Sequence, residues 1–204
     1  MNIIKLSSTK FKLVFKDPLE IMLNYFTSIF LSSEKQDSNT IVLYAKSITF
    51  LKSGLSDPMQ LILSLKQQQE FLEKHGYSFF VLNVEDIIVI NDSIFVCINS
   101  NLIKAFKEGT QLLYFYKPYD RPKHIGTSLT FFSPELNKKV LPAIVSYKTA
   151  YYSLGALVIY CLFGLDIKNK NIDEILLPIK YSKLYWFLKR CLDENPKNRY
   201  LIYV

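Results

Sequence analysis

The chain has 204 residues, of which 50% are hydrophobic and 15% aromatic, which is enough to bury one domain-sized core and excludes an intrinsically disordered protein. Its formal net charge is +7, but arginine occurs only at positions 121, 190 and 199, and the lysines form no basic run. We therefore interpret the charge as a solvated lysine surface and expect no nucleic-acid partner.

The cysteines indicate a reducing compartment. Cys97, Cys161 and Cys191 are odd in number, widely spaced and set in apolar surroundings, which is typical of buried free thiols rather than of a disulfide framework. The two histidines have no cluster of further ligands around them, so we expect no metal site. Residues 1–16 lack the apolar core of a secretory signal, and we expect a cytoplasmic protein.

The first 49 residues predict a small region of mixed strands and helix. Asp17 has the side chain of an N-cap residue, and Pro18 suits the first turn of a helix. The expected elements are one or two strands in 2–16, a helix from Asp17 to about Leu31, a polar loop at 32–39 and a strand at 40–45.

The remainder, from residue 50 onward, is expected to be mostly helical around one central element. Tyr151–Gly164 is apolar on nearly every helical face, which predicts a buried helix that ends at Gly164. This stretch is shorter than the roughly 20 residues that a bilayer requires, so we expect no membrane contact. The other expected elements are helices at 57–74, 172–179 and 181–192, strands at 79–82, 86–90, 94–98 and 112–116, an extended segment at 129–133, and a connection with some helix at 137–148.

Four stretches of this second part resemble motifs of the protein kinase C-lobe. Their order and spacing agree across residues 57–199, so the resemblance implies an α+β, protein kinase-like two-lobe fold, with a shortened N-lobe at 1–49 and a mostly helical C-lobe at 50–204. The four are Ser133–Leu136 for Ala-Pro-Glu, Tyr152–Gly155 for D-x-W-S-L-G, Leu188–Arg199 for L-x-x-x-C-L-x-x-x-P-x-x-R, and Phe71–Gly76 with Glu85–Ile90 for the approach to the catalytic loop and the P-E-N-I-L-L strand.

The same resemblance implies several structural residues. In the family, the Glu of Ala-Pro-Glu forms a buried ion pair with the late Arg, which here are Glu135 and Arg199. The alternative is that the two are unrelated surface residues. Gly155 in the central helix and Trp186 in the late amphipathic helix are the other residues that we expect to have structural roles.

The catalytic positions fall on unsuitable residues. The His-Arg-Asp motif falls on Phe79–Val81, and Val81 has no side-chain oxygen to accept or orient the proton of a substrate hydroxyl. The catalytic-loop Lys becomes Asn83, the metal-binding Asn becomes Asp86, and the Asp of Asp-Phe-Gly becomes Asn99. One neutral amide oxygen then stands where Mg²⁺ prefers a carboxylate.

The parts that would hold a nucleotide are also incomplete. The first glycine is Gly54, so no glycine-rich loop precedes the first helix. Lys46 is a weak candidate for the nucleotide-binding Lys, although the resemblance places it where the lobes join. Glu20 either replaces the helix Glu of the family or is an ordinary acidic residue in a first helical turn. Ala150 stands where the central helix of the family has an Asp that braces the catalytic loop.

These substitutions favour a catalytically inactive pseudokinase that acts as a protein-binding scaffold or regulator. Its partner would be another protein, such as a kinase or a kinase substrate, and no cofactor is expected. Length and composition are also similar to the reduced kinase-like proteins of large DNA viruses, which would place the chain in the host cytoplasm or the virion. Tyr114, Phe115, Tyr116 and Tyr119 form a candidate interaction patch; the alternative is that they pack against the lobe.

Two alternatives remain open. One is a divergent kinase that transfers phosphate from ATP and Mg²⁺ to Ser or Thr through Asp86, Asp92 or Glu85; the other is a nucleotide binder without transfer, for which Asp86 and Lys46 are weak candidates. Convergence of Asp86 and Asn99 on one cavity would favour an enzyme. A cleft filled by the side chains of Phe79 and Phe80 would oppose it.

Overall fold

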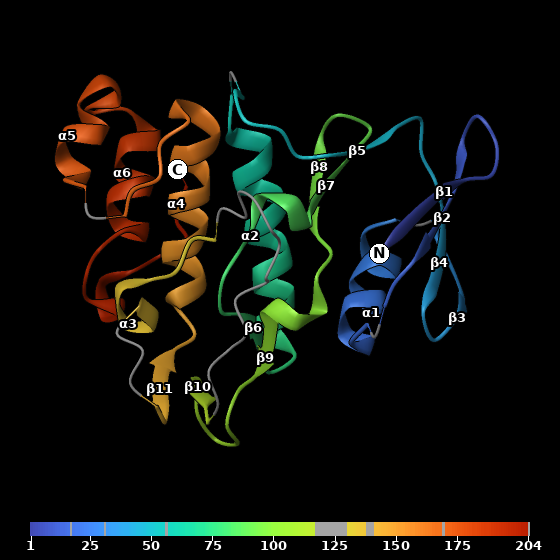
Figure 1. Ribbon diagram of the computed structural model, residues 1–204, viewed down its shortest axis with the longest axis horizontal. Coiled ribbons are helices and arrows are strands. Elements are labelled where there is room, and N and C mark those ends of the chain that lie inside the picture. The colour runs from blue at the N-terminus through green and yellow to red at the C-terminus, as the bar shows by residue number, and fades with distance from the viewer. Residues whose placement is uncertain are drawn as a thin grey trace.

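The computed structural model describes residues 1–16, 18–30, 32–55, 57–116, 130–137, 141–168 and 170–203. Figure 1 shows the elements side by side, from an N-terminal sheet on the right, through helix α2 (Met59–Lys74) and its strands, to helices α4 (Thr149–Phe163), α6 (Lys183–Cys191) and α5 (Ile172–Leu176) on the left. One cluster of buried side chains extends through these layers, from Phe11 to Leu201.

The N-terminal sheet is antiparallel. Phe11 and Leu13 alternate inward, as a half-buried strand requires, and helix α1 (Glu20–Ile29) lies against them. The ring of Phe26 on α1 is fully buried, 5.7 Å from the ring of Phe15. The strand order is β1 (Asn2–Lys5), β2 (Lys10–Val14), β4 (Thr40–Tyr44) and β3 (Glu34–Asp37).

Two expectations for this region were wrong. Helix α1 begins at Glu20 with Leu19 in the N-cap position, so Pro18 precedes the helix, while Asp17 lies outside the described residues. The segment 32–39 is not only a loop, because it contains strand β3. Every residue of β3 is exposed and none is apolar, so the strand depends on its pairing with β4 rather than on a hydrophobic face.

Helix α2 is the scaffold for the middle of the molecule. It begins at Met59, two residues after the predicted start at Asp57, and the Asp57 carboxylate accepts a hydrogen bond from the N–H of Met59 at 2.9 Å. Its buried Gln68 bonds both backbone groups of Cys97, donating to the carbonyl at 2.8 Å and accepting from the N–H at 2.9 Å. This clamp fixes strand β8 on the helix. The sheet here is β5 (Ile48–Phe50), β7 (Ile87–Ile90) and β8 (Ile94–Cys97).

Two short ribbons complete the strands. Strand β6 (Tyr77–Phe79) pairs with β9 (Ile103–Ala105), and β10 (Leu112–Phe115) pairs with β11 (Ala143–Ser146). Strand β11 falls where a connection with some helix was expected, and β6 begins two residues before the strand predicted at 79–82. A short helix, α3 (Pro134–Asn137), precedes β11.

The helical layer is built on α4. As predicted, this helix is buried on most faces, and Gly164 caps its end with a left-handed φ of 67°.

Cys97, Cys161 and Cys191 are free and buried. Within the part of the chain that the structure describes, no helix has the length and apolar character that crossing a membrane would take. Three 3₁₀ helices lie beside these elements, η1 (Val84–Asp86), η2 (Ser100–Leu102) and η3 (Leu177–Ile179), and a fourth, η4 (Pro196–Asn198), follows α6.

Candidate functional site

The segment that aligns with the His-Arg-Asp motif is packed into the core. Phe79, Phe80 and Val81 are exposed to solvent by only 1%, 5% and 1%. Phe79 ends strand β6, and the N–H of Phe80 donates to the backbone carbonyl of Leu102 at 3.0 Å. The side chain at position 81 is therefore a small apolar group in a dry environment, where no proton can be accepted.

Hydroxyl groups of α4 hold this segment in place. Ser153 accepts a hydrogen bond from the N–H of Leu82 at 2.7 Å, and the Thr149 hydroxyl donates to the carbonyl of Phe80 at 3.3 Å. Both side chains are fully buried. Ala150 lies between them and carries no polar group. Neutral hydroxyls thus brace the backbone at a place where a carboxylate would have to be desolvated.

Three of the residues singled out from the sequence meet at one polar cluster. Asp86 ends η1, and Asn99 is the N-cap residue of η2. Asn83 Nδ2 donates to Asp86 Oδ2 at 2.6 Å, and Asn99 Nδ2 donates to Asp86 Oδ1 at 3.0 Å. We call Asn83, Asp86 and Asn99 the amide–carboxylate cluster. Val81, the fourth such residue, does not take part in it.

The two carboxylate oxygens of Asp86 accept their hydrogen bonds from amides within the cluster. Each carboxylate oxygen of Asp86 accepts from one amide, and the Asn99 oxygen accepts from the N–H of Asn101 at 3.0 Å. Turning the Asn83 amide over would place two oxygens 2.6 Å apart, which is repulsive unless a cation lies between them. As arranged, amide protons take two of the roughly four acceptor positions of the half-buried Asp86 carboxylate.

One atom of the cluster is unsatisfied. Asn83 is 2% exposed, and its Oδ1 has no hydrogen-bond partner among the described residues. An unpaired buried acceptor costs about 1–3 kcal/mol. The described residues contain no group of three or more His, Cys, Asp and Glu side chains that could hold a metal ion.

The nucleotide candidates from the N-terminal region do not reach this cluster through any described contact. Lys46 follows β4 with an exposed side chain, and its N–H donates to Asn91 Oδ1 in the β7–β8 turn at 2.7 Å. Glu20 forms an ion pair with Lys35 on β3 at 3.6 Å, and its side chain is 78% exposed. Glu20 therefore behaves as a surface residue of the first helical turn.

Glu135 and Arg199 do meet, although they are 64 residues apart. Arg199 donates to both carboxylate oxygens, from Nη1 at 2.6 Å and from Nη2 at 3.0 Å. Its side chain is fully buried, and its Nε also donates to the carbonyl of Asp193 at 2.8 Å. This bidentate geometry fixes α3 against the end of the chain.

Of the other two structural candidates, one contributes to packing and one faces outward. A Cβ at Gly155 would lie 2.9 Å from Cys191 Cβ and 3.0 Å from Leu192 Cγ, so α4 and α6 touch where only glycine fits. Trp186 was expected to be structural, but it is 49% exposed, because Phe187 and Leu188 take the core side of α6. That expectation needs correction: its described ring contact is with Tyr185.

Sequence reasoning missed a half-buried polar group, Glu73 on α2. The Glu73 carboxylate accepts from the Tyr151 hydroxyl at 3.0 Å and from Gln69 Nε2 at 2.7 Å. Burial raises the pKa of Glu73 above its ordinary value, although these hydrogen bonds act against the rise. Tyr151 is 78 residues away, so local sequence gives no signal for the contact.

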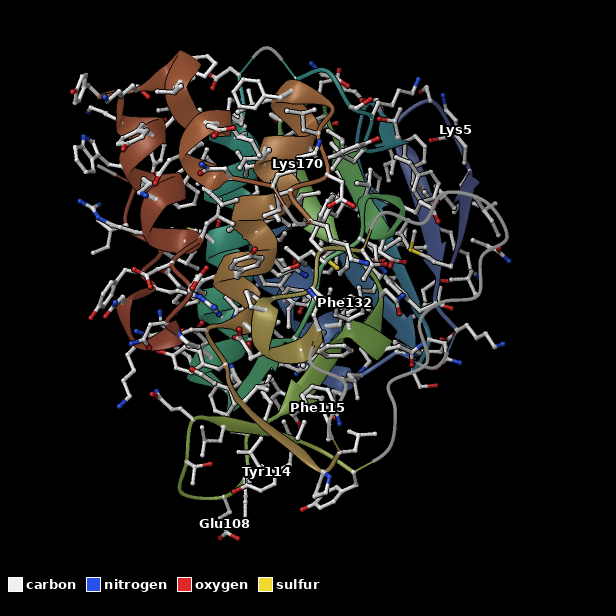
Figure 2. All side chains as sticks on the ribbon, turned by 60° about the vertical axis from the view of Figure 1, so that its left-hand side comes forward. Lys5, Glu108, Tyr114, Phe115, Phe132 and Lys170 are labelled. Carbon is white, nitrogen blue, oxygen red and sulfur yellow. The ribbon has the colours of Figure 1, made fainter. Side chains whose placement is uncertain are left out.

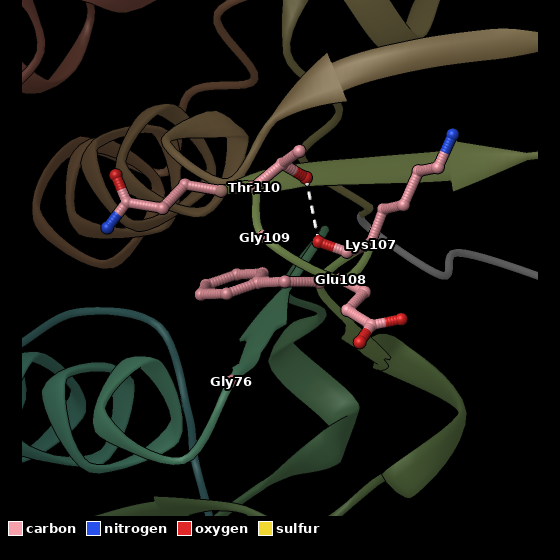
Figure 3. Close-up of a pocket in the computed structure, with 7 residues that line it drawn as sticks. Gly76, Lys107, Glu108, Gly109 and Thr110 are labelled. Atoms are coloured by element: carbon pink, nitrogen blue, oxygen red, sulfur yellow. Dashed lines mark hydrogen bonds between the residues drawn. The ribbon is translucent and has the colours of Figure 1, made fainter.

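A pocket of about 570 Å³ opens beside the loop between β9 and β10 (Figure 3). It is lined by Gly76 and residues 106–111, and the Thr110 hydroxyl donates to the carbonyl of Lys107 at 2.8 Å. None of the residues of the amide–carboxylate cluster lines it. Lys107 and Glu108 bring opposite charges, so the lining favours neither anions nor cations.

Only part of the predicted aromatic patch is exposed to solvent. Phe115 is buried, whereas Tyr116 is 73% exposed and its ring lies 6.3 Å from that of Tyr114. Figure 2 shows Tyr114 near Glu108 at one tip of the molecule. Tyr119 lies outside the described residues.

Comparison with known proteins identifies the architecture. No family model and no curated protein sequence matches the chain. Among solved structures, it is similar to titin kinase and its flanking domains, with a TM-score of 0.52 and 16% identity. The fold is kinase-like. The match covers 94% of this chain and 39% of that chain, so the kinase-like fold extends over nearly all of the present sequence.

Proposed function

We propose that the chain is a pseudokinase, a kinase-like domain that binds another protein as a scaffold or regulator and does not transfer phosphate. The observation that carries this proposal is Val81, which has no side-chain oxygen and is 1% exposed at the position that the resemblance assigns to the catalytic Asp. Phosphoryl transfer depends on that carboxylate to orient the attacking hydroxyl. The buried free cysteines support a reducing compartment such as the cytoplasm.

The amide–carboxylate cluster supports the same proposal. The family's two metal-binding positions carry an Asn and then an Asp; here they carry Asp86 and then Asn99. One carboxylate and one amide remain, but both amides of the cluster donate to Asp86. A cation bound by both oxygens would compete with these two donors, and it would gain only one charged ligand.

A second candidate is cation or nucleotide binding without transfer. It is favoured by the convergence of Asp86 and Asn99, whose side chains are 3.0 Å apart, and by the unsatisfied buried oxygen of Asn83. A rotated Asn83 amide would offer that oxygen to a cation. Phosphate transfer is opposed in this candidate too. The position of the catalytic motif is taken by the buried apolar side chains of Phe79 and Phe80.

Thermal unfolding with and without ATP and Mg²⁺ or Mn²⁺ separates these candidates. Under the pseudokinase proposal we expect no shift in Tm, whereas a ligand at a hundredfold excess over its Kd would add about 2.7 kcal/mol. A clear metal-dependent shift of the unaltered protein would favour the second candidate, cation or nucleotide binding, over binding of a partner protein alone. Phosphoryl transfer would then be assayed with Asp86→Ala as the control.

The variant Asn99→Asp tests whether the amides replace a cation. It places two carboxylates about 3 Å apart, since Asn99 now lies 3.0 Å from Asp86, and like charges at this distance resist ionisation together. We expect a loss of about 1–3 kcal/mol at neutral pH that Mg²⁺ or Mn²⁺ restores. Asn101→Asp, two residues further on an exposed position, is the matched control and should respond to neither ion.

A further inference from the structure

The outer surface of the helical layer carries exposed aromatic side chains. Tyr181, in the turn before α6, is 74% exposed, and Trp186 on α6 is 49% exposed. Tyr185 joins them, with its ring 6.5 Å from that of Tyr181 and 5.0 Å from that of Trp186. Leu177 of η3 is 58% exposed beside this turn. We call Leu177, Tyr181, Tyr185 and Trp186 the α5–α6 face; Figure 1 shows these two helices at the outer end of the molecule.

The core does not use Leu177, Tyr181 or Trp186, whereas Tyr185 is half-buried and also packs against it. Phe187, Leu188 and Cys191 supply the buried side of α6. Tyr181 also has a left-handed backbone with φ of 67°, a conformation that costs a non-glycine residue about 1–2 kcal/mol. A strained backbone that presents a large apolar ring to solvent is typical of a position used for binding.

One cation lies over an aromatic ring of this face, and two more lie on the same side of α6. Lys180 Nζ lies 5.0 Å from the centre of the Tyr181 ring. Lys183 and Arg190 lie three residues before and four residues after Trp186, so they share its side of the helix. Among the residues that the structure describes, none of these three forms an ion pair, whereas Lys189 is paired with Asp173. The positive charge of the face is therefore available to a partner.

We propose that the α5–α6 face binds an acidic, extended segment of a partner protein. Trp, Tyr and Arg are the residues that most often dominate the energy of protein interfaces. The three cations have no ion-pair partner among the described residues and complement carboxylates, although Arg190 Nη1 also donates to the carbonyl of Ile202 at 3.4 Å. The aromatic rings beside them complement apolar side chains. This inference rests on the proposed binding function and names the surface and the class of partner.

Two other classes of partner fit less well. The Tyr185 and Trp186 rings meet at 79°, so they do not form the parallel platform on which successive bases stack. A flat anionic membrane would contact α5 together with α6, and Asp173 and Glu174 on α5 would oppose it. A narrow peptide can follow the cations and avoid these carboxylates.

The chain offers a built-in probe, because Trp186 is its only tryptophan. The test titrates the full chain with a random copolymer of glutamate and tyrosine and follows tryptophan emission. We expect a saturable change that a lysine–tyrosine copolymer does not produce and that weakens as salt is added. Absence of a saturable change, or tighter binding of oligothymidine or phosphatidylserine vesicles, would overturn the proposal.

Charge-reversal variants locate the binding surface. Lys183→Glu combined with Arg190→Glu should weaken binding of the glutamate–tyrosine copolymer at least tenfold. The control combines Lys16→Glu with Lys52→Glu, two exposed residues elsewhere, and changes the net charge equally. We expect no such loss in the control. Equal losses in the two double variants would show that only net charge matters. Neither result depends on ATP, so failure here is distinguishable from failure of the pseudokinase proposal.

A last variant separates binding from folding. Tyr181→Gly removes the exposed ring and relieves the left-handed backbone. We expect weaker copolymer binding with an unchanged or raised Tm. A lowered Tm with unchanged binding would assign Tyr181 to the fold instead.

Discussion

Glu73 is a carboxylate in a partly buried place, and its charge works against the folded state at neutral pH. Burial raises its folded pKa above the ordinary 4.5. The proton is therefore held more tightly in the folded than in the unfolded chain. The stability gained from this proton is complete below pH 4.5 and is lost as the pH rises through the folded pKa.

Glu73→Gln should remove this pH dependence. A glutamine cannot ionise, and its Oε1 can still accept from the Tyr151 hydroxyl. We expect the variant to be more stable than the parent at neutral pH by roughly 1 kcal/mol, with little difference at acid pH. Urea unfolding at both pH values measures this. Glu108→Gln, on an exposed loop, is the control, and an equal effect there would contradict the explanation.

Single residues were predicted best where a motif fixed their spacing. Counting from the resemblance brought Asn83, Asp86 and Asn99 to one place in the structure. The direction of the amides was not predictable, because it depends on hydrogen bonds among side chains from separate elements. The role of Ser153 was missed for a similar reason, since its partner Leu82 is 71 residues away.

At the scale of elements, the contact between α4 and α6 depends on Gly155. A methyl group there would lie 2.9 Å from Cys191 Cβ, which belongs to a rigid buried neighbour. We expect Gly155→Ala to cost about 1–3 kcal/mol by overpacking, despite the better helix propensity of alanine. Urea unfolding measures the loss.

Leu192→Ala provides the matched test of this packing. It removes the Cγ atom that would lie 3.0 Å from the new methyl group. Gly155→Ala should therefore cost less in the Leu192→Ala background than alone, a coupling that a double-mutant cycle detects. Strict additivity would show that the clash is not the cause.

Elements with strong hydrophobic patterns were predicted from sequence, and elements that exist only by pairing were not. The long helices α2 and α4 lie where their apolar patterns indicated. Strand β3 was missed, because Glu34–Asp37 has no apolar face and forms against β4. Strand β11 was missed because it has only four residues and because its partner, β10, lies some 30 positions earlier in the chain.

At the scale of the whole molecule, the Glu135–Arg199 pair ties the middle of the chain to its end. Arg199 is fully buried, so Glu135→Gln would leave its charge without a counterion. We expect a loss of about 3–5 kcal/mol in the free energy of unfolding. Asp173→Asn, which breaks the exposed pair with Lys189, should cost about 0–1 kcal/mol. Similar losses in the two variants would contradict the structural role of the buried pair.

The kinase-like fold was predictable because four motifs kept their order across the second part of the chain, and the likeness to titin kinase supports that fold. The division into two lobes and the assignment of 1–49 to a reduced N-lobe stay predictions. The partner stays a prediction, because which side chains of the α5–α6 face lie on the surface depends on how α6 packs, and that packing is seen only in the structure.

The packing of Val81 also bears on evolutionary history. Substituting Asp there would bury a carboxylate at a site that is 1% exposed, which costs several kcal/mol out of a total stability of about 5–15 kcal/mol. The hydroxyls of Thr149 and Ser153 already fix the backbone on either side. Under the pseudokinase proposal, a lineage with valine at this position would not regain an acid there by one mutation without first loosening the packing around it.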